Sequence, residues 1–208
     1  MRREAANASS RKSCPQPGGA RCPGSQSGTQ YNWPVKDTNG DFPEINLYST
    51  FCKPFIENNL ALIEDMGYNP VIRGWLWHQG ESDSATEKIQ VYAQRLGDMV
   101  AQFREDFEDY APFGDGDEIA FIDGMIYQGE GTAWGKDTSV AMNEAKQAFA
   151  DSGENNYIVD IYANEEPIPE NELKPGQPGG DSMHYNTKSC LRLGMAYGKV
   201  IVDNDLLW

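Results

Sequence analysis

Val71-Ile72-Arg73-Gly74-Trp75-Leu76-Trp77 is a short and mostly apolar run, and His78-Gln79-Gly80-Glu81-Ser82-Asp83 follows it directly. A bounded apolar run of this length is typical of a buried parallel strand. The polar hexapeptide after it contains a glycine and several hydrogen-bonding side chains, which is typical of a loop. The sequence therefore predicts a buried strand over 71–77 whose carboxyl end carries a polar turn.

Helical and strand patterns alternate on both sides of this run. Apolar residues recur at three- and four-residue steps before it, in a predicted helix that begins near Tyr48 and ends at Gly67. Further helices are predicted over 89–107, 140–149 and 191–200, and further strands over 118–122 and 157–161. Strands joined by helices predict the α/β class, with three layers and a doubly wound parallel sheet.

Ligands of doubly wound sheets bind beyond the carboxyl ends of the strands. This rule selects three loops, namely residues 78–83, residues 123–134 and the loop that ends at His184. The chain has two histidines, His78 and His184, and both lie in these loops.

The loop at 78–83 has three possible uses. Residues 79–81 offer an amide side chain and main-chain N–H groups that suit a developing oxyanion. His78 with Glu81 and Asp83 forms a set of metal-ligand types. The same residues also fit a polar turn in which Ser82 or Asp83 caps the next helix.

A second motif, Asp181-Ser182-Met183-His184-Tyr185-Asn186, lies just before the last predicted helix. The spacing of three places Asp181 and His184 on one side of a turn, where the carboxylate can orient the imidazole and stabilise its protonated form. Taken alone, the motif fits equally well an ordinary loop aspartate and a surface histidine.

Together the two motifs resemble the sialate O-acetylesterase domain and the related family-six carbohydrate acetyl-esterases, which are SGNH (GDSL-like) hydrolases. The resemblance is carried by Trp-x-Gln-Gly-Glu-x-Asp at 77–83 and Asp-x-x-His-Tyr-Asn at 181–186. A looser match comprises Gly28-Thr29 and Trp33. The resemblance covers about residues 28 to 202.

This resemblance implies a serine esterase that removes acetyl groups from the hydroxyls of a carbohydrate substrate. His184 would be the general base and Asp181 would orient it. Gln79 and Gly80 would line the oxyanion side of the acyl carbon, and Glu81 would be a structural or substrate-side hydrogen-bond partner. No metal and no organic cofactor is implied.

The sequence departs from this family at the nucleophile. Family members carry it in a Gly-Gln-Ser-Asn block after a first apolar strand, and no such block occurs in this chain. Residues 24–28, Gly-Ser-Gln-Ser-Gly, contain similar letters in another order without an apolar strand before them. We therefore expect a domain that lacks its N-terminal strand and an identifiable triad serine. One alternative is an inactive, glycan-binding or degenerate relative, and another is a metal-dependent hydrolase that uses His78, Glu81, Asp83 and His184.

The charge distribution divides the chain at the same place. Residues 1–27 contain five basic residues and one acidic residue, a net of +4, and no Val, Ile, Leu, Phe, Tyr or Trp. Residues 28–208 contain 12 basic and 31 acidic residues, a net of −19. We expect a disordered basic leader over 1–27 and one domain over 28–208. The net charge of −15 argues against nucleic acid and anionic membranes as partners.

Overall fold

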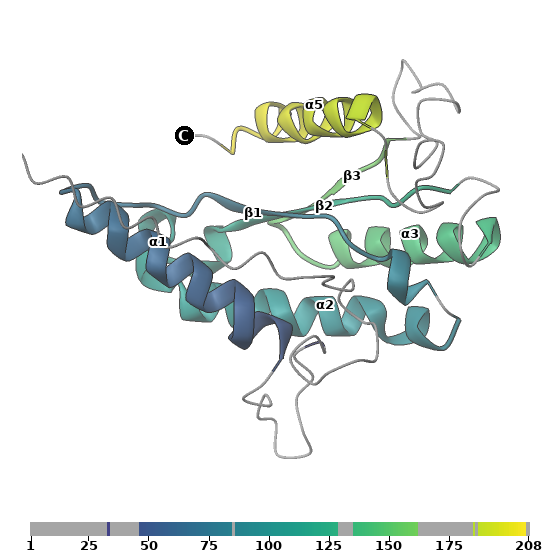
Figure 1. The fold of residues 1–208 in the computed structure, drawn as a ribbon, viewed down its shortest axis with the longest axis horizontal. Coiled ribbons are helices and arrows are strands. Elements are labelled where there is room, and N and C mark those ends of the chain that lie inside the picture. Colours follow the sequence, from purple (N-terminus) through teal and green to yellow (C-terminus); the bar gives the residue numbers. More distant parts are fainter. Residues whose placement is uncertain are drawn as a thin grey trace, which may run out of the picture.

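The computed structural model describes Trp33, residues 46–84, 86–128 and 135–161, Tyr185 and residues 187–206 (Figure 1). The predicted boundary between the leader and the domain lies outside these residues.

A parallel sheet of three strands lies at the centre, in the order β1 (Gly74–Trp77), β2 (Ala120–Gly124) and β3 (Asn156–Val159). Trp77 lies opposite Asp123, and Gly124 lies opposite Val159. Because all three strands run in one direction, their carboxyl ends meet at one edge of the sheet, where the polar segments after the strands come together.

Helices cover both faces of this sheet. One face carries α1 (Lys53–Asp65), which continues from a π-helical turn over Tyr48–Cys52, together with α2 (Thr86–Asp106) and α3 (Lys136–Ala150). The opposite face carries α5 (Thr187–Asp203), drawn in yellow in Figure 1. This arrangement confirms the predicted α/β class with helices on both sides of a parallel sheet.

Alternation along β2 divides the apolar core into two parts. Phe121 packs with α2 and α3, where Met99 and Met142 are fully buried. Its neighbour Ile122 points to the other face and packs with Tyr197 of α5. A strand buried on both faces reads as a continuous apolar run, which is why β2 was recognisable in the sequence.

The prediction of a buried strand over 71–77 is wrong in part. The strand begins only at Gly74, and Leu76 is 53% exposed. Among the described residues β1 pairs with β2 alone. The alternate residues Trp75 and Trp77 pack against the core, whereas Leu76 points to the other, more open face. β2 begins two residues later than expected because a 3₁₀ turn, whose cap is the carboxylate of Asp115, occupies Gly116–Glu118.

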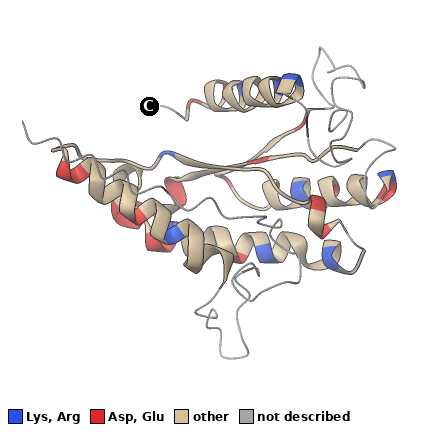
Figure 2. Cartoon of the chain, in the orientation of Figure 1, with Lys and Arg blue, Asp and Glu red and all other residues tan. Residues whose placement is uncertain are grey.

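Acidic residues are distributed over several elements, including α1 and the sheet (Figure 2). Within the described part of the chain, no helix has both the length and the apolar character that crossing a bilayer requires.

Candidate functional site

The turn after β1 is built around Gly80. Its φ of 147° is a conformation that side chains rarely adopt, and a Cβ at this position would lie 3.2 Å from both Ile126 Cγ2 and Met142 Cγ. Its carbonyl accepts hydrogen bonds from Ser84 Oγ at 2.8 Å and from the N–H of Asp83 at 3.0 Å. Glycine is therefore required here by both backbone conformation and space.

Asp83 fixes the side chain of Gln79 in this turn. Gln79 is 5% exposed, and its Nε2 donates to Asp83 Oδ2 at 2.8 Å. The same oxygen accepts from Trp33 Nε1 at 3.1 Å, while Asp83 Oδ1 lies 3.3 Å from Lys88 Nζ. Both carboxylate oxygens of Asp83 thus contact protein donors, and these contacts hold the turn in place.

The main-chain carbonyl of Gln79 is held by two helices beneath the sheet. Lys146 of α3 donates to it at 2.5 Å, and Tyr92 of α2 donates to it at 3.0 Å. Lys146 Nζ also lies 2.9 Å from Asp123 Oδ1, and both side chains are essentially inaccessible to solvent. The end of β2 and the turn after β1 therefore share one buried cation.

Burial raises the pKa of Asp123 to about 6, although the nearby charge of Lys146 acts in the opposite direction. Lys146 forms an ion pair with this carboxylate, but among the described residues neither Asp123 oxygen accepts a well-directed hydrogen bond. A buried carboxylate is costly to leave without its ion-pair partner.

His78 and Glu81 form a second, more accessible pair at the same edge. His78 Nε2 lies 3.5 Å from Glu81 Oε1, and the two side chains are 27% and 12% exposed. Burial acts to raise the pKa of Glu81, but hydrogen bonding to His78 and its charge outweigh this effect, so the pKa is lowered. Glu81 is therefore ionised at neutral pH.

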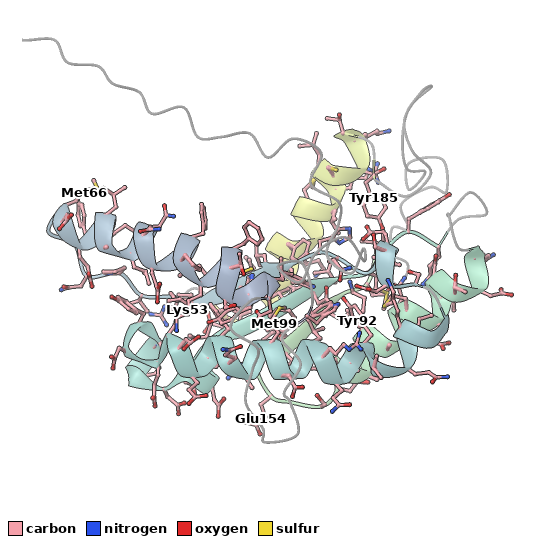
Figure 3. All side chains as sticks on the ribbon, turned by 60° about the horizontal axis from the view of Figure 1, so that its bottom comes forward. Lys53, Met66, Tyr92, Met99, Glu154 and Tyr185 are labelled. Atoms are coloured by element: carbon pink, nitrogen blue, oxygen red, sulfur yellow. The ribbon has the colours of Figure 1, made fainter. Side chains whose placement is uncertain are left out.

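Tyr185 belongs to the second motif and lies beside the first. Its ring centroid is 5.5 Å from that of His78, and its hydroxyl donates to the carbonyl of Met125 at 3.2 Å. In Figure 3, Tyr185 and Tyr92 lie toward the same end of the molecule, away from Met66. Asp181 and His184, the predicted base and its partner, lie outside the described residues.

The structure also contains site residues that the sequence reasoning missed. Lys146 looks like a surface residue by type, but it lies on the apolar stripe of α3, four residues after Met142 and three before Phe149. A lysine at such a position is the available signal for a buried cation. Asp123 begins one of the three loops that the sequence selects, but nothing in the sequence marks it as the buried partner of Lys146.

Among the described residues, the side chains suggested as metal ligands do not converge on one point. His78 pairs with Glu81, whereas Asp83 is directed to Trp33, Gln79 and Lys88. In the regions that the structure describes, no group of three or more His, Cys, Asp or Glu side chains is placed to hold a metal ion.

Comparison with known families gives one match that spans most of the chain. The family model described as "Carbohydrate esterase, sialic acid-specific acetylesterase" matches residues 23–203, a range that includes both motifs and all three strands. Comparison with curated proteins finds no match. The chain belongs to the carbohydrate esterase family of sialic acid-specific acetylesterases.

Proposed function

We propose that the protein is a carbohydrate O-acetylesterase that hydrolyses acetyl esters of sugar hydroxyls by a Ser-His-Asp mechanism. The observation that carries this proposal is the contact between the rings of Tyr185 and His78. Tyr185 directly follows His184 in the chain, and His78 directly precedes Gln79. The contact therefore supports a single site built from both motifs.

In the proposed reaction a serine hydroxyl attacks the acetyl carbon and transfers its proton to His184, which Asp181 orients. The carbonyl oxygen becomes an oxyanion. His184 then gives the proton to the departing sugar oxygen, and water releases acetate from the acyl-enzyme by the same steps in reverse order. The serine is not identifiable from the sequence, and covalent labelling of the active serine would locate it.

The oxyanion contact is assigned to the main-chain N–H of Gly80. Gln79 Nε2 already donates to Asp83, whereas the N–H of Gly80 has no hydrogen-bond partner among the described residues. In this assignment Gln79 stabilises the turn through Asp83, and Glu81, ionised beside His78, is a structural or substrate-side hydrogen-bond partner.

The test is acetate release from O-acetylated sialic acid and from 4-nitrophenyl acetate by the full chain. We expect turnover that His184→Ala abolishes and that Asp181→Asn lowers by several orders of magnitude, since triad members act as a unit. A fluorophosphonate probe should label one serine, which peptide mass spectrometry then identifies. Turnover that persists in His184→Ala would contradict the mechanism.

A second candidate function is binding of acetylated glycans without hydrolysis. It is favoured by one observation, the absence of a Gly-Gln-Ser-Asn block from the 208 residues. Retained binding of O-acetylated sialic acid without acetate release or serine labelling would select this candidate over the esterase.

A further inference from the structure

The peptide group between Gln79 and Gly80 is anchored from one side only. Its carbonyl oxygen accepts from Lys146 Nζ and from Tyr92 Oη, which lie on two different helices beneath the sheet. A peptide group is planar, and no described peptide bond is cis. The N–H of Gly80 therefore points away from these two donors, in the direction opposite to the carbonyl.

Lys146 is itself anchored. Its ammonium group lies 2.9 Å from Asp123 Oδ1 at the end of β2, and its side chain has no solvent exposure. The strand register places Asp123 opposite Trp77, the last residue of β1 before the turn. The cation thus connects the end of one strand to the first peptide groups after its neighbour.

We propose that Lys146, held by Asp123, is a positioning residue that aims the main-chain N–H of Gly80 at the oxyanion of the reaction. This inference deepens the proposed function and rests on it for the role of Gly80. Lys146 touches neither substrate nor acyl carbon, and it acts through the Gln79 carbonyl. Tyr92 restrains the same carbonyl, but its hydroxyl is shared with Gln79 Oε1 at 3.3 Å.

The sharpest test is a double variant that removes the ion pair and keeps the volume apolar, Asp123→Leu/Lys146→Met. Replacing both members of a buried ion pair by apolar residues is often neutral or stabilising, so this protein should remain folded even where Lys146→Met alone does not. A misdirected oxyanion donor stabilises the transition state less while leaving substrate binding almost unchanged. We therefore expect kcat to fall about a hundredfold with KM within about twofold.

A second readout does not depend on turnover. Hydrogen–deuterium exchange of the segment 79–84 should be at least about tenfold faster in the double variant, because the Gln79 peptide loses its strongest anchor. The matched control is Arg104→Met, which removes a half-buried cation that donates to Ile119 and Asn155 carbonyls at the opposite end of the sheet. This control should leave kcat and the exchange of 79–84 unchanged.

A folded double variant with the original kcat and the original exchange in 79–84 would overturn the proposal. Equal acceleration of that segment by Arg104→Met would also overturn it, since the effect would then be a general loss of stability. If the unsubstituted chain releases no acetate, the proposed function fails, and the exchange comparison alone decides whether Lys146 positions the turn.

Discussion

Two basic side chains beneath the sheet hold its opposite ends in different ways. At the amino ends of the strands, Arg104 donates to the carbonyls of Ile119 and Asn155 and to Asn156 Oδ1, at 2.9 to 3.1 Å. At the carboxyl ends, Lys146 donates to one carbonyl and pairs with one carboxylate. Among the described residues, the oxygens that accept from this guanidinium at the starts of β2 and β3 are uncharged.

The two ends of the sheet differ in what the loss of the basic side chain leaves behind. Loss of Arg104 leaves several neutral acceptors without a donor near the surface, where water can replace it. Loss of Lys146 leaves a carboxylate alone in the interior and releases the peptide group of the candidate oxyanion site. A buried basic side chain therefore supports stability at one end, and at the other end we propose that it supports both stability and chemistry.

The largest expected effect is that of Lys146→Met on stability. It should lower the free energy of unfolding by about 3–5 kcal/mol at pH 8, because Asp123 is left buried without its cation. Lys146 lowers the pKa of Asp123, which is about 6 while the cation is present, so its removal raises this pKa further. The penalty therefore grows as the pH rises above about 6 and shrinks below it. Urea unfolding at pH 5 and pH 8 measures the difference, and equal losses at the two pH values would contradict the assignment.

Arg104→Met should cost less, about 1–2 kcal/mol, because water can replace the lost donor and no unpaired buried charge is left. The loss should be nearly independent of pH between 5 and 8. Chemical denaturation over the same pH range checks this. A strongly pH-dependent loss would mean that the amino end also depends on a titrating partner.

Two glycines with positive φ differ in how closely the rest of the protein packs around them. Gly80→Ala should cost about 2–3 kcal/mol, because its Cβ meets Ile126 and Met142 at 3.2 Å in addition to the backbone strain. Gly114→Ala, with a φ of 70° and nothing within 4 Å of its Cβ, should cost about 1 kcal/mol. Thermal unfolding measures both, and acetate release should fall only in Gly80→Ala.

The smallest expected effect is that of His78→Gln on Glu81. Without the histidine partner the pKa of Glu81 should rise from its lowered position, which a carboxyl carbon-13 titration records. The stability that a lowered pKa provides is present above the ordinary pKa of the group and is lost as the pH falls through the folded value. The acid-side loss should therefore be smaller in His78→Gln, and an unchanged Glu81 titration would remove His78 as its partner.

The sequence predicted the class of fold because the apolar patterns of the long helices and of the three strands are visible in it. It misplaced the start of β2, since Asp115 caps a turn that no apolar pattern reveals. It overestimated the burial of β1, because burial of a strand depends on its neighbours in the sheet as well as on its own residues.

The candidate site was predictable where it is encoded in contiguous motifs. Gln79 and Gly80 stand out by residue type and by their place after a strand. Lys146 and Asp123 do not, because their pairing depends on the register between β1 and β2 and on how deeply α3 packs, and both are long-range properties. The assignment of roles to Asp181 and His184 stays a prediction.

The most direct test of one shared site uses the two histidines of the chain, His78 and His184. Imidazole nitrogens labelled with nitrogen-15 give one set of signals for each, which His78→Gln assigns. On addition of O-acetylated sialic acid to the full chain, we predict that the signals of both histidines shift together and with the same ligand dependence. A shift of one histidine alone, or of neither under saturating ligand, would contradict a site formed jointly by the two motifs.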